Sequence, residues 1–371
     1  MSTLSSTVED LLDGIAAHAS HVDATGAFPT HTLDALREAG LLGLVTPTEH
    51  GGQGGTLSDA ARVVEAIGRV CGSSAMVTCM HYAGALVLAK LGPAEINRDI
   101  AEGRHISTLA FSEAGSRSHF WAPLSTATVD GEQVVLDARK SWVTSAHHAT
   151  AYVWSSQPLG AEGASTLWLV PRESAGLQLG ERFEGLGLRG NDSVPVKAEG
   201  VRVPAAHQLG EDGAGFDHMM GIVLPAFQLM NAAASIGATR AALKAATEHV
   251  AGVRFGHLDS RLCELPTIRA YLAKAQIQAD STAALWEDAL QAVDSGRADA
   301  MLRVLQAKAA ASETSQEVTA TCMRICGGAA FRKEVGVERN FRDAQAAGVM
   351  APTSDVLYDF IGKALCGMPL F

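Results

Sequence analysis

The spacing of apolar residues changes twice along this chain of 371 residues. Up to about residue 105 the apolar residues recur at the intervals of helices, from about 106 to 210 they alternate as in strands, and from about 211 the helical spacing returns. These changes predict a helical domain over 1–105, a β domain over 106–210 and a four-helix bundle over 211–371. Because helices and strands occupy separate stretches, the predicted fold class is α+β.

Breaker residues suggest where the helices of the first region begin and end. A short helix that includes Asp34 is predicted to end at Gly40, because glycine readily adopts the left-handed conformation found after helices. Ser58 is a suitable cap for one long helix over Asp59–Leu91, and Pro93 is predicted to begin the next short helix.

The middle region carries a strong hairpin signal. Asp130-Gly131 separates two strand-like segments, Ser125–Val129 and Glu132–Leu136, and a two-residue turn of this kind requires positive φ. Further strands are predicted over three segments: Ala151–Ser155, Ser165–Val170 and Pro195–Val203. This pattern is typical of a small β-barrel or a pair of sheets.

The last region is helical. Long helices are predicted over Leu229–Val250, Ile268–Val293 and Ala300–Ile325, the last ending at a pair of glycines, and a final helix is predicted to begin at Ser354.

Charge and composition exclude some classes of function. The formal net charge is −11, which argues against nucleic acid or an anionic membrane as the main partner. No uninterrupted apolar run reaches the length of a membrane span, and Glu9 and Asp10 follow an N-terminus without a basic segment, so we predict a cytoplasmic protein. The six cysteines are scattered, which predicts reduced thiols and no metal site.

The sequence near the C-terminus resembles a known family. Val337–Ala344 reads V-E-R-N-F-R-D-A, and Met350–Asp355 reads M-A-P-T-S-D. The pair resembles the V/L-E-R-x-x-R-D-A and Y-E-G-T motifs of the acyl-CoA dehydrogenase superfamily. The resemblance extends over nearly the whole chain, and it implies a helix–sheet–helix fold that binds FAD between the middle sheet and the C-terminal helices. In that family a second subunit completes the FAD site, so a homodimer or homotetramer is expected.

The catalytic base of the family is missing. Ala351 stands where many members carry the Glu that removes the α-proton, and a methyl group cannot accept a proton. Other members place the Glu on an earlier helix, at the position of Phe227. Gln228 replaces an Arg that is common at the next position.

The resemblance also implies contacts with the flavin. Phe111–Ser118 resembles the T-E-P-G-x-G-S-D loop, which lies against the flavin and the substrate thioester and here places Phe111, Ser112 and Ser118 near the cofactor. Lys140–Ser145 is similar to K-x-W-I-T-N, in which Trp142 would cover one face of the isoalloxazine and Thr144 would donate a hydrogen bond toward N5. In isolation, Trp142 would be interpreted first as a core residue on a strand, whereas beside the other motifs the flavin contact is favoured. Glu113 is interpreted as a structural member of the first loop, and Gly187–Ser193 as part of an architectural linker.

Further cofactor contacts are implied in the C-terminal region, at Arg254, Phe255, Arg324, Gly327, Gly328, Thr353 and Asp355. Arg254 resembles an arginine that meets the FAD pyrophosphate of a neighbouring subunit, a role that suits a guanidinium. Arg324 replaces the Gln of a Q-x-x-G-G motif, Thr353 matches the Thr of E-G-T, and Asp355 stands where a Gln often meets the cofactor.

Other groups are open as the replacement for the base. His119 follows the predicted flavin loop, and imidazole titrates near neutral pH. His81 lies on a helix that the fold would bring toward the active site. Asp355 as a displaced base, water, or a substrate acidic enough to need no base are the alternatives.

Three functions follow from these observations. The first is an FAD-dependent oxidoreductase, suited to specialised metabolism, that acts on an acyl thioester of CoA or a carrier protein, or on a related carbonyl compound, by non-standard chemistry. Its electron acceptor would be an electron-transfer protein or oxygen. The second is a flavin-dependent monooxygenase or oxidase, which needs no α-proton base. The third is a non-catalytic partner subunit, although the retained Trp142, Thr144 and Arg254 favour bound flavin.

Overall fold

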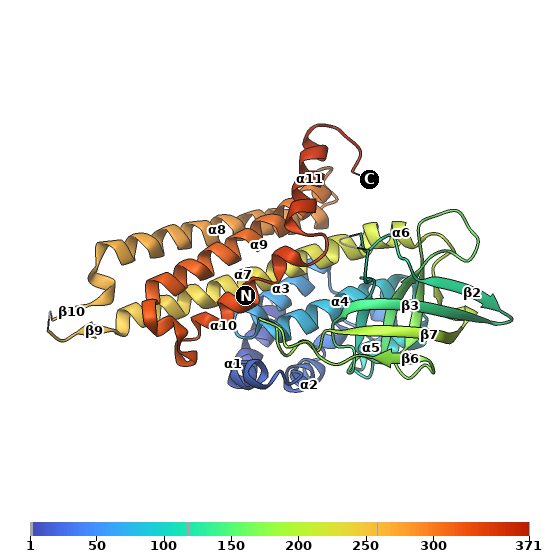
Figure 1. The fold of residues 1–371 in the computed structure, drawn as a ribbon, viewed down its shortest axis with the longest axis horizontal. Coiled ribbons are helices and arrows are strands. Elements are labelled where there is room, and N and C mark those ends of the chain that lie inside the picture. Colours follow the sequence, from blue (N-terminus) through green and yellow to red (C-terminus); the bar gives the residue numbers. More distant parts are fainter. Residues whose placement is uncertain (1–2, 117–118, 258, 371) are drawn as a thin grey trace.

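A computed structural model describes residues 3–116, 119–257 and 259–370 (Figure 1). Helices, strands and helices follow one another in that order along the chain, which confirms the predicted α+β class. Long helices extend from one end of the molecule, the sheets lie at the other, and the N-terminal helices pack beside their junction (Figure 1). Ser118 of the predicted flavin loop lies outside the described residues.

The N-terminal region contains α1 (Thr3–Thr25), α2 (Thr30–Glu38), α3 (Leu57–Gly68), α4 (Gly72–Leu91) and α5 (Ala94–Ala101). The single helix predicted over Asp59–Leu91 is wrong, because α3 and α4 divide it. Thr56, rather than Ser58, caps α3: its Oγ1 accepts the Asp59 N–H at 3.1 Å, and the Asp59 carboxylate accepts the Thr56 N–H at 2.9 Å. The predicted break after α2 is confirmed, since Gly40 has a φ of 70°.

The described residues of the middle region form two four-stranded sheets, one of the two arrangements predicted. One sheet has the order β2 (Thr126–Asp130), β3 (Gln133–Val143), β7 (Val194–Pro204), β6 (Leu177–Leu179), and the other has the order β1 (Ser107–Ala110), β4 (Ala151–Ser156), β5 (Thr166–Pro171), β8 (Gln208–Leu209). The predicted hairpin is confirmed: Asp130 pairs with Gln133, and Gly131 has a φ of 64°.

A core fills the space between the sheets. Leu136 on β3 and Val196 on β7 are buried in one cluster with Tyr152 and Trp154 on β4 and Trp168 on β5. Full burial of large apolar side chains stabilises a fold by about 1.5–3 kcal/mol each. This core holds the end of β3 in place, where the predicted flavin contacts begin.

The C-terminal region contains α6 (Gly215–His218), a π-helical turn (Met219–Val223), α7 (Leu224–Gly252), α8 (Pro266–Asp294), α9 (Ala300–Cys326), α10 (Val337–Ala344) and α11 (Ser354–Leu365). The hairpin of β9 (Arg254–Phe255) and β10 (Ser260–Arg261) joins α7 to α8. Helices α7, α8 and α9 lie side by side, while the shorter α10 and α11 pack against α9 (Figure 1). The described residues of this region thus form the predicted C-terminal helical domain, and its α7 also packs on α3 and α4.

Two helical stretches, Gly72–Leu91 and Gly215–Gly252, are long and apolar enough to cross a membrane by composition alone. However, 78% and 67% of their most apolar windows are buried inside the protein. Helices that are apolar on all sides are common in protein cores. These two therefore serve as the helices that join the three regions.

Candidate active site

A cavity of about 820 Å³ lies where the three regions meet. Its walls come from Met76 and Met80 on α4, from the segments 111–115 and 141–144, from 182–193, and from the segments 223–228 and 346–353. A cavity of this size is within the range of small-molecule sites in proteins. Five residues predicted to contact the cofactor line it: Phe111, Ser112, Trp142, Thr144 and Thr353.

A buried ion pair fixes the loop that carries Phe111 and Ser112. Lys140 on β3 donates through Nζ to Glu113 Oε1 at 2.5 Å and to the Ser155 carbonyl at 2.7 Å. The Glu113 carboxylate also accepts the N–H groups of Leu124 and Ser125, at 2.5 and 3.1 Å. Burial lowers the pKa of Lys140 to about 8, although the Glu113 carboxylate opposes this shift. The structural role predicted for Glu113 agrees with these contacts.

Trp142 projects out of its sheet. The pairing of β3 with β7 shifts register between Lys140 and Val143, and Trp142 has a φ of 57°. Val143 stays buried, whereas the side chain of Trp142 is 63% exposed and its ring centroid lies 4.3 Å from that of Phe183. The core position considered for Trp142 is therefore wrong. An exposed indole at a cavity wall suits a residue that covers a planar ligand.

Thr144 and its neighbours form a hydrogen-bonded strip beside Trp142. The Thr144 hydroxyl lies 3.0 Å from the Ser193 hydroxyl, and the Thr144 carbonyl accepts a hydrogen bond from Thr108 Oγ1 at 2.8 Å. Asp192 accepts two hydrogen bonds from His147, one from its N–H at 2.8 Å and one from Nδ1 at 2.9 Å. Thr144 is thus held with its hydroxyl at the cavity wall.

The segment 182–193 forms a wall that the sequence does not reveal. Gly187–Ser193, predicted to be an architectural linker, contributes several lining residues, and Arg182 and Phe183 join them. The segment is anchored to α10, where Asp343 Oδ1 accepts the Leu188 N–H at 2.6 Å. A Cβ at Gly187 would collide with the carbonyl oxygen of Arg342. The glycines of this stretch were the sequence feature that could have predicted a close approach of this segment to another backbone.

The two positions predicted to lack the family's base line one cavity. Ala351 and Phe227 line the cavity together, and Gln228 lines it beside them. Glu113 and Asp192 are the carboxylates that line the cavity in the described ranges, and both already accept several hydrogen bonds. No described carboxylate in this cavity is therefore left without partners to act as a base.

Neither predicted histidine lines this cavity. His119 lines a separate space of about 500 Å³ beside α11, together with Asp355, and its ring packs edge-on against Trp121 at 5.1 Å. Asp355 thus lines a different cavity from the one that Thr353 lines.

His81 is a buried structural residue. Its Nε2 lies 2.9 Å from the Leu42 carbonyl, and its Nδ1 accepts the Ser107 N–H at 3.2 Å. Burial lowers the pKa of His81 to about 4, so the ring is neutral near pH 7. Packing of α4 against β1 and the Leu42 turn therefore places this ring in backbone contacts rather than at the cavity.

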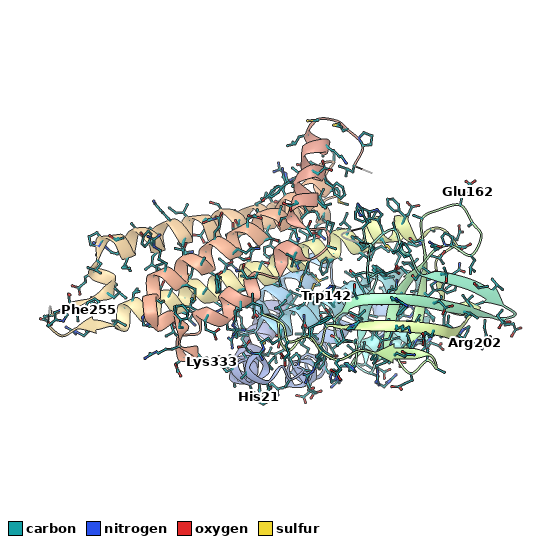
Figure 2. All side chains as sticks on the ribbon, in the orientation of Figure 1. His21, Trp142, Glu162, Arg202, Phe255 and Lys333 are labelled. Carbon is teal, nitrogen blue, oxygen red and sulfur yellow. The ribbon has the colours of Figure 1, made fainter. Side chains whose placement is uncertain are left out.

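The remaining predicted cofactor residues lie at the far end of the long helices. Figure 2 shows Phe255 at one end of the molecule and Trp142 near its middle. Arg254 is exposed on β9, and its guanidinium lies 3.2 Å from Asp259. Arg324 near the end of α9 stacks over Tyr271 at 4.8 Å, and no atom would meet a Cβ at Gly327 or Gly328 within 4 Å. These residues do not reach the cavity of their own chain.

Comparison with known proteins decides the family. The N-terminal, middle and C-terminal domain families of acyl-CoA dehydrogenases match residues 2–102, 108–201 and 213–366. The mitochondrial short-chain specific acyl-CoA dehydrogenase of Bos taurus is 30% identical over 350 residues, covering 91% of this chain and 83% of that protein. The chain belongs to the acyl-CoA dehydrogenase family. It is an FAD-dependent oxidoreductase, as members of this family are.

Other members of the acyl-CoA dehydrogenase family agree with this assignment. A cyclohex-1-ene-1-carbonyl-CoA dehydrogenase of Geobacter metallireducens is 28% identical and covers 95% of this chain and 93% of its own. The solved butyryl-CoA dehydrogenase of Megasphaera elsdenii superposes with a TM-score of 0.91 at 22% identity, covering 99% of both chains. The superposition on butyryl-CoA dehydrogenase shows that the two proteins share a fold.

The residues present fit the FAD of an acyl-CoA dehydrogenase. The exposed Trp142 ring provides a flat apolar wall, and the Thr144 hydroxyl lies at the same cavity. When bound, FAD supplies the hydride acceptor. The residues that would hold it are those of the 111–115 loop and Trp142, and the Thr144 hydroxyl could donate a hydrogen bond to it.

Proposed function

We propose that this acyl-CoA dehydrogenase homologue oxidises an acyl thioester, carried by CoA or a carrier protein, without a carboxylate base of its own. One observation carries the proposal. Ala351 and Phe227, which occupy both family positions for the base, line the same cavity as Trp142 and Thr144. The α-proton then passes to water, or the substrate is acidic enough to lose it without a strong base.

Two copies of the chain would complete each FAD site, as a homodimer or homotetramer. This part of the proposal rests on Arg254, Phe255 and the Gly327-Gly328 pair. They suit binding of a phosphate, but they follow the C-terminal ends of α7 and α9 and do not line the 820 Å³ cavity. Figure 2 shows Phe255 at one end of the molecule, away from Trp142. A second copy is the simplest way to bring the two sets together. The cytoplasmic location predicted from the sequence stays a prediction.

A second function is favoured by the same missing base. A monooxygenase or oxidase lets the reduced flavin react with oxygen and has no need of a carboxylate beside the α-carbon, so Ala351 and Phe227 are compatible with it. The dehydrogenase differs in its acceptor, which would be an electron-transfer protein.

One experiment distinguishes the dehydrogenase from the oxygenase. The purified protein is examined for flavin absorbance, reduced anaerobically with dithionite, and mixed with air in a stopped-flow instrument. Slow reoxidation without an intermediate spectrum supports the dehydrogenase. A transient absorbing species between the reduced and oxidised spectra supports the oxygenase. Failure to hold or take up FAD would contradict both and leave the partner-subunit hypothesis.

A further inference from the structure

The wall of the cavity contains a carboxamide without a partner. Gln228 on α7 is fully buried, and neither its Oε1 nor its Nε2 has a hydrogen-bond partner among the described residues. Buried polar groups in native proteins are nearly always paired, because an unpaired one loses its bonds to water without replacement. Gln228 also lines the 820 Å³ cavity. A ligand in that cavity is therefore the natural partner for the amide.

The amide lies near the segment that contains Ala351. Asn231 follows Gln228 by about one helical turn on α7, so the two side chains share a face of the helix. Asn231 Nδ2 lies 3.0 Å from Met350 Sδ, the residue before Ala351. Since Gln228 and Ala351 also line one cavity, the amide borders the space in which the proposed acyl thioester would bind.

The surroundings of Gln228 decide which group it suits. The lining residues from its own helix and the turn before it are Val223, Leu224 and Phe227, and Met76 and Met80 face the same cavity. Among these apolar neighbours a charged substituent would need a counter-charge, whereas a neutral one needs only a matching donor and acceptor. An amide offers both, and so does a hydroxyl.

We propose that Gln228 binds a hydroxyl group on the acyl chain, close to the thioester, and so selects hydroxyacyl thioesters over plain acyl thioesters. This inference rests on the proposed function, because it assigns the substrate class of that site. A purely apolar pocket discriminates weakly against a missing hydroxyl, while a site built to hydrogen-bond the hydroxyl rejects the analogue that lacks it. Gln228 is the described residue in this cavity whose side chain has both polar atoms buried and unpaired.

Binding of three probes tests the proposal. Pantetheine thioesters of butyrate, 2-hydroxybutyrate and 3-hydroxybutyrate carry the arm common to CoA and carrier proteins. Their dissociation constants are measured by calorimetry on the flavin-loaded protein, so the result does not depend on turnover. We expect one hydroxybutyryl probe to bind about tenfold more tightly than the butyryl probe, as one buried hydrogen bond provides.

Two variants identify the residue responsible. Gln228→Leu keeps a similar length and removes the amide, so it should weaken the preferred hydroxy probe about tenfold and leave the butyryl probe equal or tighter. Its melting temperature without ligand should rise, because an unpaired buried amide is removed. Phe227→Leu is the matched control from the same wall, and it should shift all probes by a similar factor.

Each contrary outcome has a distinct meaning. Equal binding of all three probes to the wild type, or a preference that persists in Gln228→Leu, overturns the inference and leaves the acyl thioester proposal in place. An unchanged or lower melting temperature of Gln228→Leu would show that the amide is paired in solution and also overturns it. Failure of every probe to bind the flavin-loaded protein overturns both proposals.

Discussion

Lys308 on α9 donates a hydrogen bond through Nζ to the carbonyl of Pro352, at 2.8 Å. The same Nζ contacts the Met350 carbonyl at 3.1 Å, so one buried ammonium group holds both residues that flank Ala351. The segment around Ala351 is therefore held by a side chain from a different helix.

Lys308 should make stability depend on alkaline pH. Burial lowers its pKa from 10.5 to about 7, so between these values the unfolded chain binds a proton that the folded chain lacks. Stability therefore rises with pH across this window, by at most about 1.4 kcal/mol per pH unit. Urea unfolding of wild type and Lys308→Met at pH 7, 8 and 9 checks this. As pH rises, the free energy of unfolding of the wild type should increase relative to that of Lys308→Met. An equal pH dependence of the two free energies would contradict the assignment.

Glu113→Gln should destabilise the protein by about 3–5 kcal/mol, because it leaves the buried Lys140 ammonium without its carboxylate. The 111–115 loop should lose its position, so the flavin content of the purified protein should fall. Denaturant unfolding and the ratio of flavin to protein absorbance measure the two effects. Glu113→Gln combined with Lys140→Met removes both charges and should be more stable than the single variant. If Glu113→Gln is as stable as the wild type, the Glu113–Lys140 ion pair does not stabilise the fold as proposed.

Ala351→Glu should introduce a general base. The new carboxylate would extend from a residue that lines the cavity shared with Trp142 and Thr144. A positioned base typically accelerates proton transfer by about 10²–10⁴-fold. The rate of anaerobic flavin bleaching by butyryl-CoA measures the effect, with Ala351→Gln as a control of similar size. A robust wild-type rate that stays unchanged in Ala351→Glu would contradict the proposed loss of the base.

His81 should make the protein sensitive to acid. Its folded pKa of about 4 lies below the ordinary value of 6.5, so between these values the unfolded chain binds the extra proton. Stability should fall as pH decreases through this window, by at most about 1.4 kcal/mol per unit. The comparison of wild type with His81→Asn at pH 4.5, 5.5 and 7 isolates this residue from His105, whose pKa is also lowered to about 4. An equal pH dependence in both proteins would refute the assignment.

Arg254→Ala should weaken FAD retention about tenfold or more, since a charge-assisted contact with phosphate is lost. The side chain is exposed and far from the 820 Å³ cavity of its own chain, so folding should be unaffected. Equilibrium dialysis against FAD measures the effect, and Lys244→Ala, another exposed cation of this region, is the control. Equal FAD affinity in the two variants would argue against a contribution of Arg254 to a neighbouring site.

The sequence by itself determined the order of helices and strands, the Asp130-Gly131 hairpin and the family. These depend on local patterns, namely hydrophobic period, turn chemistry and short motifs, which a linear chain displays directly. It also showed that Ala351 and Phe227 lack a carboxylate. It could not show that both residues face one cavity, because they are separated by more than a hundred positions along the chain.

Only the tertiary structure decided the roles of the individual polar groups. His81 looked available for catalysis until the Leu42 and Ser107 backbones were found to engage both of its nitrogens. Gln228 looked like a simple replacement of arginine, yet burial without a partner makes it a candidate for binding substrate. The physical reason is the same for both residues. The protonation and hydrogen bonding of a polar side chain depend on its burial and on the partners that packing places beside it.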